Sequence, residues 1–195
     1  MLRRVCVFCG SSTGNSRVYA DAARQLGIEL ARRGIGLVFG GGAVGLMGVV
    51  ADAVLAGGGH AIGVIPHALV ARELAHRALP DLRVVNSMHE RKATMAELSD
   101  AFIAMPGGFG TFEEFCEAVT WTQLGVHRKS CGLLNIDGFY DPLIAQFDGG
   151  VAEGFIKPGN RAIVVAHPDA ATLLDALVMP APAPEAPWIG GPQEA

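Results

Sequence analysis

The sequence predicts a single α/β domain of the Rossmann-like, doubly wound type, with a parallel sheet and helices on both faces. Two observations predict it: short β-branched and apolar runs alternate with helical stretches, and glycines gather where the expected strands end. The length agrees, because 195 residues suit one domain of ordinary size. Hydrophobic residues make up 50% of the chain, so a large buried core is possible.

The individual elements are predicted from the spacing of hydrophobic residues and from the residues that typically begin and end helices and turns. Strands are expected at residues 5–9, 36–39, 61–65, 82–85, 101–105, 132–135 and 163–165. Helices are expected at residues 16–33, 46–55, 67–78, 87–98, 111–124, 142–153 and 170–178, with Gly34 and Gly57 marking two helix ends. We assign residues 1–179 to the domain and the proline- and alanine-rich residues 180–195 to a disordered tail.

Charge and hydropathy exclude several classes of function. With 15 basic and 19 acidic residues the net charge is −4 and no basic stripe exists, which argues against a nucleic-acid partner. No apolar run reaches the roughly 18 residues that span a bilayer, and the N-terminus lacks the pattern of a signal peptide. We therefore expect a soluble cytoplasmic protein without a membrane partner.

The cysteines do not indicate a metal site. Cys6 and Cys9 form a CxxC pattern, but they lie in an expected strand, where residues three apart point to opposite faces. No second pair and no finger-like Cys/His spacing accompanies them. We interpret the cysteines as buried, reduced thiols and expect no metal.

Three glycine-rich loops follow expected strands, at residues 10–14, 40–48 and 106–111. In open parallel sheets ligands bind outside the carboxyl ends of the strands, and glycine lets backbone amides approach a phosphate. Gly40, Gly42 and Gly45 form a GxGxxG pattern, yet the next strand ends without the acidic residue that a dinucleotide-binding site requires. No Gly-Lys-Ser/Thr follows any loop, so a P-loop is excluded as well.

The segment Pro106-Gly107-Gly108-Phe109-Gly110-Thr111-Phe112-Glu113-Glu114 is the most informative of these. One reading is a capping box, with Thr111 as N-cap and Glu114 as its reciprocating partner. That reading leaves the upstream proline and glycines unexplained, whereas a nest of N–H groups that binds an anion explains them. Glu114 would then lie one turn from the anion, and Glu113 points about 100° away around the helix.

The second informative segment is Ser87-Met88-His89-Glu90-Arg91-Lys92. Ser87 and Glu90 resemble a capping box, which places Arg91 and Lys92 near a helix N-terminus, where each cation opposes the dipole by roughly 0.3–1 kcal/mol. Arg91 also shares an inward-facing stripe with Met95. Arg91 and Lys92 could be two solvated charges, or they could bind an anion. Their positions favour the binding of an anion.

Together, these two segments resemble the signature of the Lonely Guy (LOG) family of cytokinin riboside 5′-monophosphate phosphoribohydrolases, an Arg-Lys pair followed by PGGxGTxxE. The resemblance covers nearly the whole chain except the tail, although Phe109 stands where the family often has Tyr. Similar sequences have been called lysine decarboxylases, but no lysine here lies in a recognisable pyridoxal-phosphate context.

The resemblance implies a homodimer that hydrolyses the N-glycosidic bond of an N6-modified adenosine 5′-monophosphate, with no metal or redox cofactor. It implies Arg91 and Glu114 as catalytic residues, with Glu114 beside the anomeric carbon and the 5′-phosphate on the amides of residues 108–111. The implied substrate contacts are Glu73, Arg91, Lys92, Gly107, Gly108, Phe109, Gly110, Thr111, Phe112, Glu113, Glu114 and Thr120. A non-catalytic nucleotide- or cofactor-binding module and an NAD-linked oxidoreductase remain the alternatives.

Overall fold

Seven parallel strands form the centre of the molecule in a computed structural model that describes residues 2–70 and 75–183. The strand order is β4-β3-β2-β1-β5-β6-β7. The strands are β1 (Arg4–Phe8), β2 (Gly36–Phe39), β3 (Ala61–Pro66), β4 (Asp81–Val85), β5 (Ala101–Ala104), β6 (Ser130–Leu134) and β7 (Val164–His167). The doubly wound parallel sheet that the sequence predicts is therefore confirmed.

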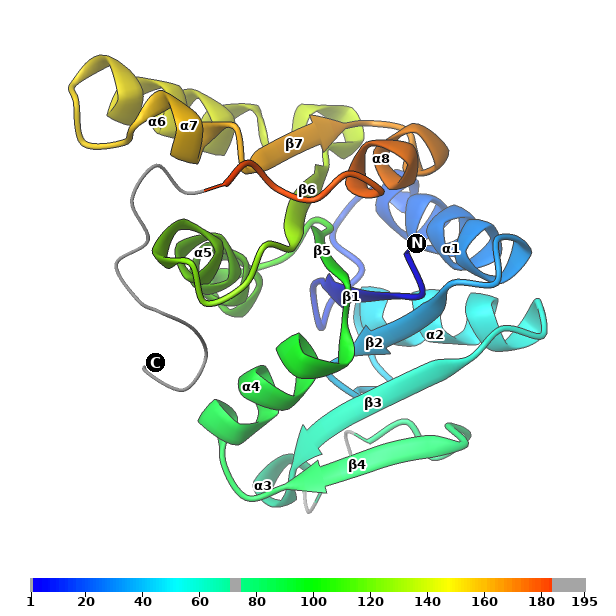
Figure 1. Ribbon diagram of the computed structural model, residues 1–195. Helices are drawn as coiled ribbons and strands as arrows, with labels where there is room; N and C mark the ends of the chain where they lie inside the picture. The colour runs from blue at the N-terminus through cyan, green and yellow to red at the C-terminus, as the bar shows by residue number, and fades with distance from the viewer. Residues whose placement is uncertain (1, 71–74, 184–195) are drawn as a thin grey trace.

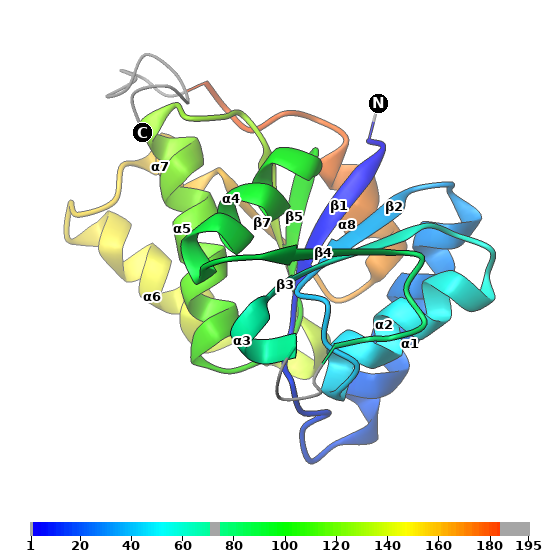
Figure 2. The same cartoon turned by 90° about the horizontal axis from the view of Figure 1, so that it is seen from below.

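Helices cover both faces of this sheet (Figure 1). The helices are α1 (Arg17–Arg32), α2 (Gly45–Ala56), α3 (His67–Val70), α4 (Met88–Leu98), α5 (Phe109–Leu124), α6 (Asp141–Ala152), α7 (Pro158–Arg161) and α8 (Ala170–Leu177). Seen from below, α1 and α2 lie on one side of the sheet and α4, α5 and α6 on the other (Figure 2). Two apolar clusters result, one on each face of the sheet.

The alternation of side chains along β1 assigns each residue to one of these clusters. Val5, Val7 and Cys9 belong to the cluster with α1, α2 and α8, while Cys6 and Phe8 belong to the cluster with α4 and α5. Cys6 and Cys9 thus point to opposite faces, as the sequence predicts. Cys6, Cys9 and Cys131 are buried free thiols, but Cys116 is exposed, contrary to our reading of the cysteines as buried.

The strand order places a switch point beside β1. The chain runs from β1 outward to β4 and then returns to the other side of β1 with β5, so that Val5 pairs with both Leu37 and Ala101. Connections on the two sides of such a point diverge and leave a crevice at the carboxyl ends of the strands. The loops after β1, β2 and β5 therefore border one crevice.

Several expected elements differ in extent. Residues 67–78 do not form one helix, because α3 ends at Val70 and Ala75 makes an isolated bridge with Gly42. Glu73, which the resemblance implies as a substrate contact, lies outside the described residues. The short helix α7 was not expected; it starts at Pro158, a residue whose fixed φ suits the first helical turn.

The packed chain continues past residue 179, where we expected the tail to begin. Ala181 is 3% exposed, and its N–H donates to Arg128 O at 3.2 Å. The Ser130 hydroxyl donates to Met179 O at 2.5 Å. The side chains of this segment are small, and its backbone N–H and C=O groups are available for hydrogen bonds, so it packs beside β6. The proline content of the segment alone does not predict this packing.

Among the described helices, none is both long and apolar enough to cross a bilayer.

Candidate active site

Backbone hydrogen bonds join the three glycine loops at the carboxyl ends of the strands. Gly10 N–H donates to Pro106 O at 3.0 Å, and Leu46 N–H donates to Gly10 O at 3.0 Å. A side chain at Gly45 would place its Cβ 2.2 Å from Ser11 C, and one at Gly107 would place it 2.2 Å from Thr111 Oγ1. These glycines are therefore required by the close approach of one loop to another.

A cavity of about 430 Å³ opens where the loops meet. Its walls come from the end of β1 (residues 7–11), the loop after β2, the end of β3, α3, and the first turns of α4 and α5. The polar side chains that reach it include Arg91, Glu113 and Glu114. A cavity with an apolar wall and a few converging charged groups is the usual form of a small-molecule site.

The helix α5 begins earlier than the sequence predicts. Its N-cap is Gly108 and its side chains make no capping hydrogen bond, so Thr111 is not the N-cap and the capping box of Thr111 and Glu114 is wrong. Phe112 N–H closes the first turn on Gly108 O at 3.1 Å. The N–H groups of residues 109–111 belong to the first turn, which has no acceptors within the helix.

The glycines at the start of α5 are not explained by packing. A Cβ at Gly108 or Gly110 would meet nothing within 4 Å, in contrast to Gly107. Gly108 has an extended backbone, with φ −104° and ψ −157°, that any residue can adopt. The open space beside these positions, together with a helix N-terminus, suits an anion.

Arg91 and Glu114 form an ion pair at the inner end of this cavity. Arg91 Nη1 lies 3.2 Å from Glu114 Oε1, and both side chains are 11% exposed. Arg91 Nε also donates to Val64 O at 3.1 Å, which fixes the guanidinium against the end of β3. Its Nη2 occupies the space beside Gly40, where a Cβ would lie only 1.8 Å away. The inward direction of Arg91 that the sequence predicts is therefore confirmed.

The environment of Glu114 raises its pKa, so this carboxyl takes up a proton more readily than one in water. Burial raises the pKa of this carboxyl above its usual value, and the nearby Arg91 partly offsets the effect by lowering it. The carboxyl of Glu113 raises the pKa further. Burial also raises the pKa of the neighbouring Cys9 thiol, which lines the cavity in its neutral form. Glu114 is thus a carboxyl whose charge depends on its partners, a common property of catalytic groups.

The first turn of α4 is capped much as the sequence predicts. The Ser87 hydroxyl accepts from Glu90 N–H at 3.1 Å. Glu90 completes the cap one residue earlier than in a standard capping box, because its Oε2 accepts from Asn86 N–H at 2.8 Å and from Asn86 Nδ2 at 3.0 Å. The cap places Arg91 and Lys92 beside α5, where both pair with carboxylates, so the reading as two solvated charges is wrong.

The remaining residues implied by the resemblance do not all reach the cavity. Gly108, Phe109, Gly110, Thr111, Glu113 and Glu114 line it, as does Arg91. Phe112 instead packs against Phe139 and Tyr140, with ring centroids 6.4 and 6.2 Å away. Thr120 lies two turns further along α5, lines a separate cavity of about 200 Å³ and donates to Cys116 O at 2.7 Å.

An apolar wall of the cavity was missed in the sequence. It consists of Val44, Met47, Ile65, Leu69 and Met88. These residues lie in different segments, so no single sequence motif predicts the wall. Several of them do share one feature, a position just after a strand or at the start of the next helix. Within the described residues, no group of three His, Cys, Asp or Glu side chains lies together as a metal ion would require.

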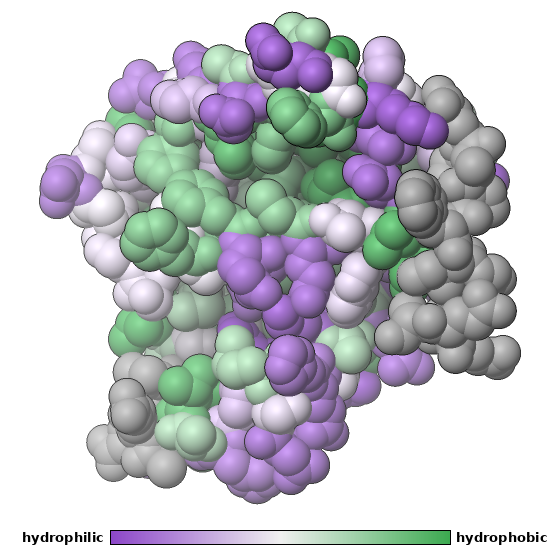
Figure 3. Space-filling model, turned by 90° about the vertical axis from the view of Figure 1, so that its left-hand side faces the viewer, coloured by the Kyte–Doolittle hydropathy of each residue, from purple (hydrophilic) through white to green (hydrophobic). Residues whose placement is uncertain are grey.

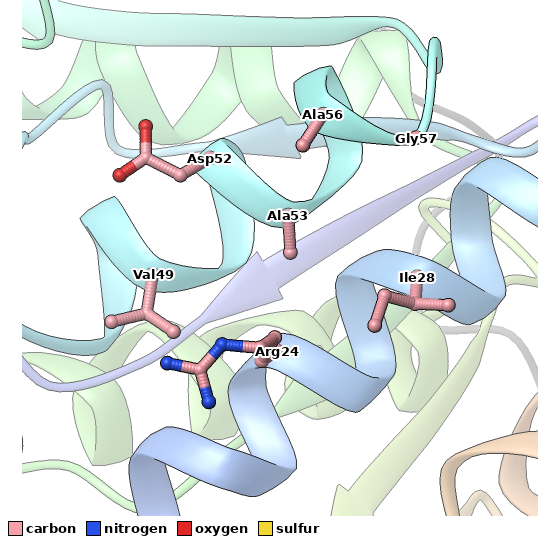
Figure 4. A pocket seen from close by; sticks show the side chains of 7 residues that line it. All are labelled: Arg24, Ile28, Val49, Asp52, Ala53, Ala56 and Gly57. Carbon is pink, nitrogen blue, oxygen red and sulfur yellow. The ribbon is translucent and has the colours of Figure 1, made fainter.

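A second cavity, of about 460 Å³, lies between α1 and α2 (Figure 4). Its two charged residues do not converge: Asp52 Oδ1 lies 2.9 Å from His76 Nε2, and Arg24 pairs with Asp21 at 2.8 Å. Figure 4 shows that the Asp52 carboxylate does not point toward the Arg24 guanidinium. The two cavities are similar in volume, but of the two it is the one beside β1 that combines charged groups with a helix N-terminus.

Comparison with known proteins agrees with the motif resemblance. The family model described as "Possible lysine decarboxylase" matches residues 47–177. The probable cytokinin riboside 5′-monophosphate phosphoribohydrolase LOGL1 of Oryza sativa subsp. japonica is 58% identical over 171 residues, which cover 88% of this chain and 77% of the relative. The cytokinin riboside 5′-monophosphate phosphoribohydrolase LOG3 of Arabidopsis thaliana is 54% identical over 183 residues, covering 94% and 85%.

Solved structures share the fold at lower sequence identity. A molybdenum cofactor carrier protein from Chlamydomonas reinhardtii superimposes with a TM-score of 0.68 at 21% identity, covering 91% of this chain and 96% of the other. The molybdenum cofactor binding protein from Rippkaea orientalis gives a TM-score of 0.67, also at 21% identity, with coverage of 92% and 99%. At this identity the likeness concerns the fold alone. From its motifs, its family match and its close relatives, the chain belongs to the LOG family, whose family model bears the description of a possible lysine decarboxylase.

Proposed function

We propose that this protein hydrolyses the N-glycosidic bond of an N6-modified adenosine 5′-monophosphate and releases the free base and ribose 5-phosphate. The observation that carries the proposal is the Arg91–Glu114 pair, 3.2 Å apart, at the inner end of a cavity bordered by the N-terminus of α5. Relatives more than 50% identical, named as cytokinin riboside 5′-monophosphate phosphoribohydrolases, support this choice of substrate.

The 5′-phosphate would bind at the start of α5. The N–H groups of residues 109–111 are free of helical acceptors, and the helix dipole favours negative charge at this end. Open space beside Gly108 and Gly110 supports close approach of a phosphate to the backbone. The apolar wall defined above would contact the base and its N6 substituent, which need apolar surface.

Cleavage of the C1′–N9 bond leaves positive charge on the ribose, in an oxocarbenium-like transition state. A carboxylate beside C1′ stabilises that charge, which is the role we assign to Glu114. The oxygen of a water molecule then bonds to C1′, the electrons of the broken bond stay on N9, and the water proton passes by way of Glu114 to the departing base. Arg91 holds the Glu114 carboxylate in place and keeps it ionised between turnovers.

Base release is the direct test. The protein is incubated with AMP and with isopentenyladenosine monophosphate, and free base is measured by chromatography. Glu114→Gln keeps the size of the side chain and removes its charge, so we expect about 10²- to 10⁴-fold slower release with unchanged folding. Wild-type rates in this variant would refute the catalytic role. Binding of nucleotide by the wild type without any release would favour a non-catalytic binding module instead.

We further propose that the protein acts as a homodimer in the cytoplasm. The resemblance to the LOG family supports the dimer, and the large apolar side chains of Phe109 and Phe155, 93% and 89% exposed, are surfaces that an association could cover. Sedimentation velocity of the purified protein tests this assembly. A single species of monomer mass at micromolar concentration would refute it.

A further inference from the structure

Lys92 does not lie where the family resemblance implies. Arg91 lines the large cavity, but Lys92, one residue later and about 100° further around α4, points between α4 and α5 instead. Its side chain is 11% exposed. Its Nζ donates to Glu113 Oε1 at 2.5 Å and to Glu117 Oε1 at 3.0 Å. Two of the three N–H groups of the ammonium are therefore used within the protein.

A second and much smaller cavity lies next to Lys92. Lys92, Glu114, Glu117 and Trp121 line a cavity of about 10 Å³, a volume comparable with one water molecule and too small for a phosphate. Figure 3 shows a hydrophilic patch near the centre of the face formed by α4 and α5, with hydrophobic surface beside it. Lys92 therefore belongs to a small cluster of charged side chains between α4 and α5, together with Glu113, Glu114 and Glu117.

Negative charges outnumber positive charges around Glu114 even with Lys92 present. Glu113 and Glu117 precede and follow Glu114 on α5, and the buried thiols Cys6 and Cys9 approach it from β1. Arg91 and Lys92 of α4 are the cations that act on it. Three carboxylates therefore face two cations. Loss of Lys92 would leave one cation among three carboxylates, an arrangement that disfavours ionised carboxylates.

Lys92 itself stays charged in this position. Burial tends to lower the pKa of its ammonium, but the hydrogen bonds to Glu113 and Glu117 outweigh burial and raise the pKa above its usual value. Lys92 in turn lowers the pKa of Glu114, while Glu113 and Glu117 raise it. The cluster therefore links the charge of Lys92 to that of the carboxylate in the cavity.

We propose that Lys92 is a positioning residue: held between Glu113 and Glu117, it offsets part of the negative charge of these two carboxylates and keeps Glu114 ionised beside Arg91, and it does not bind the substrate phosphate. The inference rests on the proposed function insofar as Glu114 acts on a substrate. The role of Lys92 in the ionisation of Glu114 is nevertheless measurable without turnover.

Lys92→Met tests the proposal, with Lys92→Arg as the variant that keeps the charge. We expect Lys92→Met to move the acidic limb of the kcat profile up by about one pH unit, an approximately tenfold loss of rate on that limb, with KM changed less than about twofold. Lys92→Arg restores most of the wild-type profile. Glu117→Gln removes a carboxylate and moves the limb in the opposite direction.

A matched control removes a cation on the other face of the sheet. Arg32 pairs with Glu29 at 2.7 Å on α1, and Arg32→Met should leave the profile unchanged. Titration of the Glu114 carboxyl by ¹³C NMR in each variant, without substrate, reports the same change independently of turnover. If Lys92→Met does not fold, Glu117→Gln carries the test by itself.

The outcomes separate the inference from the proposed function. A tenfold or larger rise in KM for Lys92→Met, with the Glu114 titration unmoved, would overturn the inference and make Lys92 a substrate ligand. An unmoved titration with unchanged KM would overturn it as well. Absence of base release by the wild type refutes the proposed function, whereas a displaced Glu114 titration in the Lys92 and Glu117 variants would still support the inference.

Discussion

Gly40→Ala tests whether the position of the Arg91 side chain matters, because it leaves the arginine itself in place. The new Cβ would lie 1.8 Å from Arg91 Nη2 and 3.0 Å from its Cζ. Ordinary van der Waals contact begins near 3.4 Å, so the guanidinium must move by about 1.6 Å. It is fixed at 3.1 Å to Val64 O and at 3.2 Å to Glu114 Oε1, and such a movement must lengthen or break one of these contacts.

A misplacement of this size in a catalytic pair costs about 10²-fold in rate, equivalent to about 2.7 kcal/mol of transition-state stabilisation. We therefore expect kcat/KM for isopentenyladenosine monophosphate to fall about 100-fold in Gly40→Ala, measured by base release. Gly149→Ala in α6 is the matched control, because its Cβ would meet nothing within 4 Å. The control should retain wild-type activity.

A double-mutant cycle then attributes the loss to Arg91. In an Arg91→Ala background the clash no longer exists, so Gly40→Ala should cost almost nothing further. Equal losses from Gly40→Ala in the wild-type and Arg91→Ala backgrounds would refute the reasoning, as would wild-type activity in the single variant.

Three further predictions follow from other contacts. Gly108→Ala places a methyl group in open space, on a backbone conformation that alanine can adopt. We therefore expect the free energy of unfolding to stay within about 0.5 kcal/mol of wild type and KM to rise about tenfold. An unchanged KM would contradict phosphate binding at this position. Tyr140→Phe removes the hydroxyl that donates to Met105 O at 2.7 Å, and should cost about 1–3 kcal/mol in urea unfolding; no loss would show that this carbonyl finds another donor. Burial and the nearby charge of Lys129 lower the pKa of His127 from 6.5 to about 4. As the pH falls, this histidine therefore takes up a proton in the unfolded chain before it does so in the folded protein, and stability is lost between about pH 6.5 and 4. His127→Phe should flatten that part of the stability profile, and an unaltered slope would contradict the assignment.

The fold and the position of the candidate site, at the loops after β1, β2 and β5, could be predicted because both depend on local patterns. Alternating apolar runs specify the strands, and glycine loops at their carboxyl ends must meet at the edge of a parallel sheet. The inward direction of Arg91 followed from its place on the stripe with Met95, which is 1% exposed. The fold-level prediction needed no information about contacts between distant residues.

The details that were missed depend on such contacts. Whether Gly107 or Gly108 is free of packing depends in part on the loop after β1, since a Cβ at Gly107 would lie 2.9 Å from Gly10 N and one at Gly108 would meet nothing within 4 Å. The capping box at Thr111 failed for a local reason, because the helix begins three residues earlier, with Gly108 as its N-cap. Lys92 illustrates the point most clearly, because its partners Glu113 and Glu117 lie on another helix, and the sequence offers no means to choose between them and an anion.

A crystal structure of the Glu114→Gln variant with isopentenyladenosine monophosphate tests the central claim most directly. The account predicts the phosphate on the N–H groups of residues 109–111 and the C1′–N9 bond beside the side chain of residue 114, near Arg91. A nucleotide bound in the groove between α1 and α2, or one whose glycosidic bond lies far from residue 114, would contradict it.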